Sequence, residues 1–222
     1  EQASYIEGVR QSGEALGQLV DELLDCASIE AGRFTINPVI ADTRPFIEGV
    51  CEMLAHRAHA KGLEIAVTVD ASVPGRLEFD SARVRQVLFN LIGNAVKFTR
   101  TGGVLIAAML EGQDFVITVT DTGPGMNEAE LAKICREFEQ VGAAGERSGG
   151  TGLGLTISTR IMAALGGTLS AASRKGAGST FTLRLPVRAV QGKVNREERG
   201  LRLAASHVLL VAPAGPAARA TV

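Results

Sequence analysis

The chain of 222 residues has no tryptophan and a single tyrosine, which argues against a surface that stacks on nucleic-acid bases. Its formal net charge is −1, so it has no basic excess of the kind that binds nucleic acid. No apolar run approaches the length of a transmembrane helix, and the N-terminus is no signal peptide. We therefore expect a soluble, cytoplasmic segment with no nucleic-acid partner and no membrane contact of its own, even if the full-length protein is membrane-anchored.

Cysteine is scarce as well. Cys26, Cys51 and Cys135 are far apart and odd in number, and they form no Cys-x-x-Cys pair. Each lies in an apolar, helix-like setting. The sequence therefore predicts reduced thiols in the core of a cytosolic protein rather than a disulfide framework.

Three short segments rich in glycine and polar residues stand out. Residues 90–99 (Asn-Leu-Ile-Gly-Asn-Ala-Val-Lys-Phe-Thr) carry two amides one helical turn apart and then a lysine. Residues 121–126 (Asp-Thr-Gly-Pro-Gly-Met) put a carboxylate on a glycine turn, and residues 149–155 (Gly-Gly-Thr-Gly-Leu-Gly-Leu) put a glycine loop before a helix. Amide oxygens suit Mg²⁺, and free N–H groups at a helix start suit phosphates. One glycine loop alone is weak evidence, but the three segments together predict a site for a nucleotide triphosphate with magnesium.

In this order, the three segments resemble the N, G1 and G2 boxes of the ATP-binding domain of sensor histidine kinases, which belongs to the wider group of gyrase, Hsp90 chaperones and MutL. Residues 136–140 correspond to the F box of that family, and residues 176–181 resemble its last glycine segment. The resemblance covers roughly residues 1–187. It implies an α/β (α+β two-layer) sandwich of the Bergerat type, with a mixed sheet covered on one face by helices and preceded by a long dimerisation helix.

The resemblance also implies roles for individual residues. Asn94 would give its carbonyl oxygen to Mg²⁺, Lys97 would reach a phosphate, and Asp121 would accept a hydrogen bond from the adenine amine of ATP. The other nucleotide-binding residues that it implies are Gly123, Gly125, Phe138, Gly150, Gly152, Leu153, Gly154 and Thr180. Simpler alternatives are a surface amide, a solvated lysine, an aspartate that starts a turn, and a core aromatic at Phe138. Arg147 is a candidate for the γ-phosphate, with a solvated arginine as the alternative.

Asn90 separates the kinases from the hydrolytic members of the group, which carry a glutamate here that activates water. An amide cannot accept a proton at neutral pH, so Asn90 favours phosphoryl transfer to a histidine over hydrolysis. Two alternatives stay open: a hydrolytic ATPase of the same fold group, and an ATP-binding pseudokinase that serves as an interaction module.

The pattern along the chain predicts four regions. The apolar residues of residues 1–33 follow the 3-4 spacing of a coiled coil or four-helix bundle, with an amphipathic helix packed on its own domain as the alternative. Residues 24–34 resemble the end of the second dimerisation helix of histidine kinases, which implies that residues 1–33 are the second helix of a dimerisation and histidine-phosphotransfer domain. Residues 34–188 are the expected catalytic domain, residues 189–205 a linker, and residues 206–222 the start of a receiver-like domain. The residues of the helical seam are Ile6, Val9, Gly13, Leu16, Val20, Leu23 and Ala27.

Within the catalytic domain, apolar periodicity and turn residues predict the individual elements. Helices are expected at 44–61, 81–98 and 151–165, and strands at 34–39, 63–69, 104–110 and 115–120, with two more before Pro186. Residues 111–114 predict a hairpin turn. Residues 123–150 suit a mobile lid with one short helix.

The expected partners are a second copy of the chain through the N-terminal helix, a response regulator or receiver domain, and a small-molecule regulator. The phosphoacceptor histidine of the family lies in an earlier helix, within a His-Glu-x-Arg-Thr type motif that this sequence lacks. We therefore expect a kinase fragment in which His56, His59 and His207 are structural or surface residues. Ala212 and Pro213 stand where receivers carry an acidic pair for magnesium, so the C-terminal segment is expected to be a degenerate receiver that docks on the kinase core.

Overall fold

The computed structural model describes residues 13, 17, 20, 24, 27–29, 31–134 and 153–190. The described residues from 13 to 29 are helical, and the chain turns at Gly32, whose φ is +63°. A left-handed residue commonly follows the end of a helix, and glycine adopts this conformation without strain. Val20 and Leu24 on this helix are 47% and 60% exposed in the single chain.

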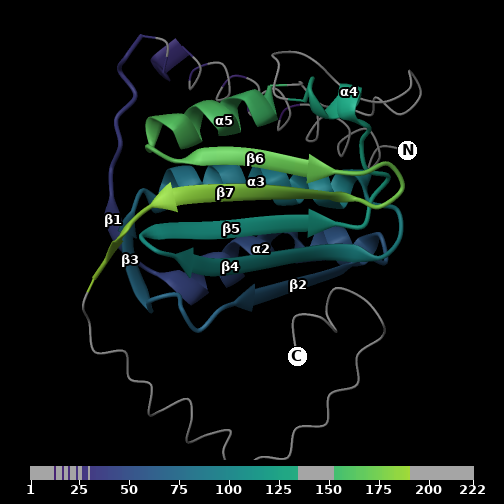
Figure 1. Cartoon of the computed structure of the whole chain (residues 1–222), viewed down its shortest axis with the longest axis horizontal. Coiled ribbons are helices and arrows are strands. Elements are labelled where there is room, and N and C mark those ends of the chain that lie inside the picture. Colours follow the sequence, from purple (N-terminus) through teal and green to yellow (C-terminus); the bar gives the residue numbers. More distant parts are fainter. Residues whose placement is uncertain are drawn as a thin grey trace, which may run out of the picture.

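The body of the molecule is a five-stranded sheet in the order β2-β4-β5-β7-β6 (Figure 1). Its strands are β2 Glu64–Val69, β4 Gly103–Glu111, β5 Asp114–Asp121, β6 Thr168–Ser173 and β7 Ser179–Pro186. β2 and β4 are parallel and the other neighbours are antiparallel, which confirms the predicted mixed sheet. Gly112 and Gln113 connect β4 to β5, and Gly112 has a φ of +63°, as a tight hairpin turn requires.

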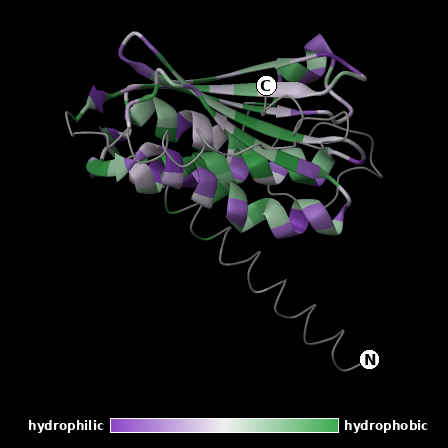
Figure 2. Cartoon of the chain, turned by 90° about the horizontal axis from the view of Figure 1, so that it is seen from below, coloured by the Kyte–Doolittle hydropathy of each residue, from purple (hydrophilic) through white to green (hydrophobic). Residues whose placement is uncertain are grey.

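Three helices cover one face of this sheet: α2 Thr43–Ala60, α3 Ser81–Phe98 and α5 Gly154–Ala164 (Figure 2). Alternate residues of the strands face these helices and form the core, which confirms the predicted two-layer sandwich. Core side chains with 1% exposure or less include Val50, Leu54, Val87, Leu88, Leu91, Ile106, Phe115, Ile117, Ile161 and Leu183. A fourth helix, α4 Glu128–Leu131, begins with a capping box between Asn127 and Glu130 and is the short helix expected after residue 123.

A second, three-stranded sheet was not predicted. It pairs β1 Val39–Asp42, β3 Arg76–Phe79 and β8 Arg188–Ala189, so Ala189 belongs to a strand rather than to a linker. The strand expected at 34–39 is wrong, since regular pairing begins only at Val39. Pro38 has no N–H group, and the N–H of Asn37 donates to the Asp80 side chain at 2.8 Å instead of to a neighbouring strand.

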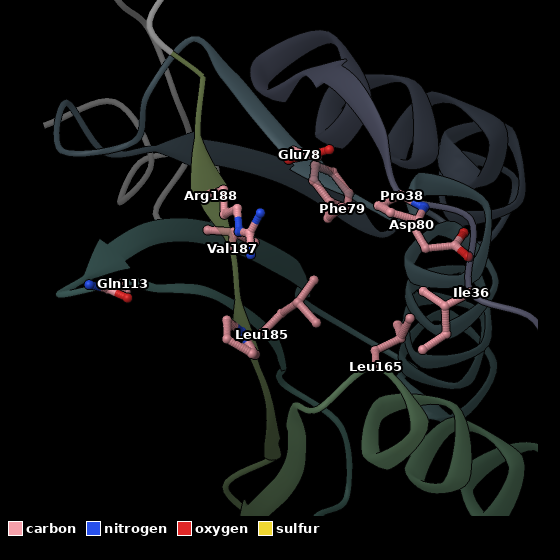
Figure 3. Close-up of a pocket in the computed structure, with 11 residues that line it drawn as sticks. Ile36, Pro38, Glu78, Phe79, Asp80, Gln113, Leu165, Leu185, Val187 and Arg188 are labelled. Carbon is pink, nitrogen blue, oxygen red and sulfur yellow. The ribbon is translucent and has the colours of Figure 1, made fainter.

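The segment that follows the N-terminal helix rests on the start of α3. Asp80 caps α3, because its Oδ1 accepts from the Arg83 N–H at 3.0 Å while its Oδ2 accepts from Asn37. The Arg83 guanidinium also lies 4.6 Å from the centre of the Phe34 ring. A cavity of about 450 Å³ lies beside these contacts, between the segment, β3 and the end of β7 (Figure 3); its lining includes Ile36, Phe79, Asp80, Leu165 and Leu185.

The remaining expectations concern cysteine, histidine and membranes. Cys51 is a buried free thiol, and burial, with a smaller contribution from Glu52, raises its pKa to about 11. His56 and His59 are exposed, as expected of surface residues. Among residues 31–134 and 153–190, no helix is long and apolar enough to cross a membrane. Cys26, Cys135, His207 and the receiver-like segment lie outside the described residues.

Candidate functional site

The central helix α3 carries the first group of predicted site residues. Its buried stripe, which includes Val87, Leu91 and Val96, packs against the sheet and neighbouring helices. Asn90 and Asn94 are half-buried at the edge of this stripe, one turn apart. The distance along the helix from Asn90 to its last residue is about 12 Å at 1.5 Å per residue, which is comparable with an extended nucleotide.

The two amides are linked to each other and to α5. The Asn94 Nδ2 donates to the Asn90 Oδ1 at 3.2 Å, and the Asn90 Nδ2 donates to the Ser158 Oγ at 2.9 Å. The side-chain carbonyl oxygen of Asn94 takes no part in these two hydrogen bonds. Mg²⁺ prefers oxygen ligands, so this atom is suited to bind it. In the described part of the chain, no group of three or more His, Cys, Asp or Glu side chains could hold a metal ion.

The glycine loop of residues 149–155 meets α3 at Gly154, the first residue of α5. A Cβ on Gly154 would lie 2.5 Å from the Asn90 Oδ1, so only glycine lets the helix start this close to the amide. Leu153 is 3% exposed, so its side chain packs in the core, and its carbonyl accepts from the Ile157 N–H at 2.9 Å. Gly150, Gly152, Phe138 and Arg147, which were also expected to contact the nucleotide, lie outside the described residues.

Asp121 ends β5 and is 8% exposed. Burial raises the pKa of this carboxyl, while hydrogen bonds from the backbone N–H groups of Gly123 and Ser179 oppose the shift. The Gly123 N–H donates to the Asp121 Oδ1 at 2.8 Å. The site thus holds a partly desolvated acceptor in a fixed orientation, which can select a ligand that offers a hydrogen-bond donor.

The glycine turn after Asp121 is interlocked with the loop before β7. Gly125 has a φ of +60°, and a Cβ there would overlap the Arg174 carbonyl. Gly178 has a φ of +84°, and a Cβ there would overlap the carbonyl of Asp121 itself. At Gly123, a Cβ would lie 2.8 Å from the Asp121 Oδ1, so the lack of a side chain lets the turn pack this closely against the carboxylate.

Thr180 does not lie on the Asp121 side of the sheet, which corrects the sequence expectation. It is opposite Thr120, and the two Oγ1 atoms are 3.1 Å apart. Ser179 is the residue opposite Asp121, and successive residues of a strand point to opposite faces. The hydroxyl on the same face as the carboxylate is therefore that of Ser179, one residue before Thr180. Phe181 is buried, and the alternation of a strand places Ser179 on the same face as Phe181.

The C-terminal end of α3 holds Lys97 and an aromatic residue that the sequence analysis did not single out. The Lys97 ammonium lies 5.0 Å from the centre of the Phe98 ring, and burial, followed by the nearby charge of Lys61, lowers its pKa. The Lys61 Nζ donates to the carbonyls of Val96 and Lys97 at 2.8 Å each and so caps the helix. Phe98 is 44% exposed. Its signal in the sequence was an aromatic residue directly after the apolar stripe of α3.

Comparisons with known proteins agree with this geometry. The family model described as "Histidine kinase-, DNA gyrase B-, and HSP90-like ATPase" matches residues 79–189, and the chain belongs to this family. The sensor protein TorS of Escherichia coli (strain K12) is 35% identical over 213 residues, which cover 95% of this chain and 23% of TorS. The sensor protein GacS of Pseudomonas syringae pv. syringae is 36% identical over 193 residues, which cover 83% of this chain and 21% of GacS.

Among solved structures, full-length ShkA in complex with AMPPNP is similar to this chain with a TM-score of 0.75 and 36% identity, over 86% of this chain and 40% of ShkA. The chain thus spans less than a quarter of TorS and GacS. The part from β1 to β8 is an ATP-binding catalytic domain of the kind found in sensor histidine kinases.

Proposed function

We propose that this chain binds ATP with magnesium and transfers the γ-phosphoryl group to a histidine on a dimerisation domain, as the catalytic part of a hybrid two-component sensor kinase. One observation carries the proposal. A single helix, α3, meets the start of α5 at Asn90 and ends beside Gly123, next to the buried carboxylate of Asp121. The groups that we propose to bind phosphate lie near Asn90, and those that we propose to bind the base lie near the C-terminal end of the same helix. A rigid helix between the two groups would fix the position of a nucleotide.

Each of these groups has a defined role in this proposal. Asp121 accepts a hydrogen bond from the adenine amine, and the exposed ring of Phe98 covers the base. The N–H groups of the glycine loop and the start of α5 face the triphosphate. Asn94 holds magnesium through its carbonyl oxygen, and the bound ion neutralises charge on the phosphates. Lys97 adds a positive charge near a phosphate.

Transfer to a protein is favoured over hydrolysis by the state of Asn90. Its amide donates to Ser158 and accepts from Asn94, so both ends of the group are already bonded. An amide so placed cannot take a proton from water. Phosphoryl transfer depends mainly on positioning and on charge neutralisation, both of which this site can supply.

The partners follow from the same proposal. The exposed Val20 and Leu24 on the N-terminal helix suit packing against helices of a second copy, and a response regulator or receiver domain would accept the phosphoryl group onward. We further propose that the segment from residue 206 is a receiver-like domain that is not phosphorylated, because Ala212 and Pro213 replace its acidic pair. Docking of that domain on the kinase core, biased by a partner or a small ligand, would then regulate transfer.

The replacement Asp121→Asn tests the nucleotide assignment. Titration of an ATP analogue with magnesium should give micromolar to millimolar affinity for the unmodified chain. The variant should bind about 10- to 100-fold more weakly, because a hydrogen bond to a charged acceptor contributes about 1.5–3 kcal/mol. Asp70→Asn is the matched control, since Asp70 is an exposed aspartate that bonds the Ser72 N–H in a turn. Equal affinity of the Asp121 variant and the unmodified chain would remove the adenine assignment.

A further inference from the structure

One buried hydroxyl has no internal partner. Thr99 is 1% exposed, and its Oγ1 is the one buried side-chain nitrogen or oxygen in the described residues that lacks a hydrogen-bond partner. Its backbone N–H is satisfied, since it donates to the Ala95 carbonyl at 3.0 Å where α3 ends. An unpaired buried hydroxyl lowers the stability of a protein, so its presence calls for a physical reason.

The position of this hydroxyl indicates that reason. The point where a Cβ on Gly123 would lie is 3.3 Å from the Thr99 Oγ1 and 2.8 Å from the Asp121 Oδ1. Thr99 comes from the end of α3 and Asp121 from the end of β5, so two separate elements bring polar groups to one small space. No side chain fits at position 123 without displacing these groups, and the backbone carbonyl of Phe98 lies 3.6 Å from the same point.

The two groups differ in what they can bond. An ionised carboxylate only accepts hydrogen bonds, whereas a hydroxyl can also donate. Adenine carries a donor, its amine, directly beside a ring nitrogen that accepts. Guanine carries an acceptor oxygen in place of that amine and would face the carboxylate with the wrong partner. An acceptor at Asp121 and a donor at Thr99 thus match the order of groups on adenine.

We infer that Thr99 is a specificity-determining residue of the nucleotide site: its hydroxyl donates a hydrogen bond, directly or through one water, to the ring nitrogen next to the adenine amine. This inference rests on the proposed function. It also explains why the unpaired hydroxyl is tolerated, because the group finds its partner when the nucleotide binds. A residue kept for such a purpose trades stability of the free protein for affinity.

The replacement Thr99→Val should raise the stability of the nucleotide-free chain and lower its affinity for ATP. Valine has nearly the same shape but no hydroxyl, so the nucleotide-free chain should unfold at a higher denaturant concentration than the unmodified chain. The same variant should bind ATP with magnesium about five- to tenfold more weakly, because one hydrogen bond to the ligand is lost. Thr99→Ser keeps the hydroxyl and should retain affinity. Thr182→Val is the control, since Thr182 lies on the uncovered face of β7.

Analogues of the base make the test specific. Isothermal titration of the whole chain with ATP, 1-deaza-ATP and 7-deaza-ATP measures what each ring nitrogen contributes. For the unmodified chain, loss of the nitrogen that Thr99 contacts should weaken binding about five- to tenfold. In Thr99→Val that penalty should disappear, because the partner of the nitrogen is already gone. The other ring nitrogen should contribute equally in both proteins.

The outcomes separate this inference from the proposed function. If the unmodified chain binds ATP and Asp121→Asn weakens binding, but Thr99→Val binds as the unmodified chain does, the Thr99 inference fails and the proposed function stands. Unchanged deaza penalties in Thr99→Val, or a variant that loses stability together with affinity, would also overturn it by making the hydroxyl a structural group. If the unmodified chain itself does not bind ATP, the proposed function fails.

Discussion

The two ends of helix α3 each have a buried aspartate, and we propose different roles for the two. Asp80 at the N-terminal end is 5% exposed, and Asp121, beside the C-terminal end, is 8% exposed. Both carboxylates accept hydrogen bonds from backbone N–H groups. Their burial and chemistry are thus nearly the same, and their surroundings decide what each one does.

Asp80 joins two segments that are far apart in the chain. One of its oxygens accepts from Asn37 and the other from Arg83, so both oxygens hold the fold together. Asp121 accepts from Gly123 in its own turn and from the backbone N–H of Ser179 on β7. It differs from Asp80 in its neighbour, because the buried Thr99 Oγ1 beside Gly123 has no hydrogen-bond partner. Asp80 is thus a structural clamp, whereas we propose that Asp121, which lies near a buried hydroxyl without a partner, recognises a ligand.

If this contrast holds, changes near the C-terminal half of α3 should alter function and leave stability nearly intact. Asn94→Ala should reduce phosphoryl transfer about 100- to 1,000-fold, because the metal loses its protein ligand and charge stabilisation worth several kcal/mol is lost. The free energy of unfolding should change by less than about 1 kcal/mol, since Asn94 is half-buried and makes one internal hydrogen bond. Transfer from labelled ATP to a supplied dimerisation domain, together with urea unfolding, measures both.

Gln113→Ala is the control for this prediction, since Gln113 is an exposed amide in the turn between β4 and β5. It should transfer at the unmodified rate. Normal transfer by Asn94→Ala would mean that magnesium is bound elsewhere.

The N-terminal end of α3 should respond in the opposite way. Asp80→Ala removes the helix cap and leaves two backbone N–H groups without their acceptor, so the free energy of unfolding should fall by about 2–4 kcal/mol. Asp80→Asn should cost about 1 kcal/mol, because an amide has one oxygen where the carboxylate has two. ATP affinity should change less than about twofold in Asp80→Asn. An affinity loss similar to that of Asp121→Asn would show that the two ends are coupled and would break the comparison.

The smallest expected effect is a pH dependence that belongs to Asp121 alone. Burial raises the pKa of this carboxyl above its ordinary 3.8, so the folded state binds the proton more tightly than the unfolded state. Its contribution to stability therefore falls as pH rises from 3.8 through the raised pKa, whereas ATP affinity rises over the same range because only the ionised form accepts fully. We expect a few-fold change in affinity.

Calorimetry and urea unfolding between about pH 4 and 7 measure the two slopes, and Asp121→Asn is the reference that lacks the titrating group. The difference between the unmodified chain and the variant isolates this one carboxyl. A difference that stays flat with pH would contradict the prediction.

Sequence patterns predicted the elements whose signals are local. Helix α3 was expected at residues 81–98 and has these bounds, because its apolar residues recur with the helical period and it has a natural cap before it. The hairpin of β4 and β5 followed from alternation around Gly112. The short strands β1, β3 and β8 have two to four residues, too few for a periodic signal, and they pair only with segments distant in the chain.

The same division applies to the site. The residue types of Asn90, Asn94 and Asp121 and their order in the chain were enough to predict a nucleotide site and to favour transfer over hydrolysis, because these properties reside in each side chain. Which hydroxyl faces the carboxylate could not be predicted so reliably, since one step along β7 exchanges Ser179 for Thr180 on the opposite face. Thr99 is buried without a hydrogen-bond partner beside Gly123, a neighbour that comes from a distant part of the chain. The sequence thus determines the chemical type of each side chain, whereas its burial and its hydrogen-bond partners arise only when distant segments pack together.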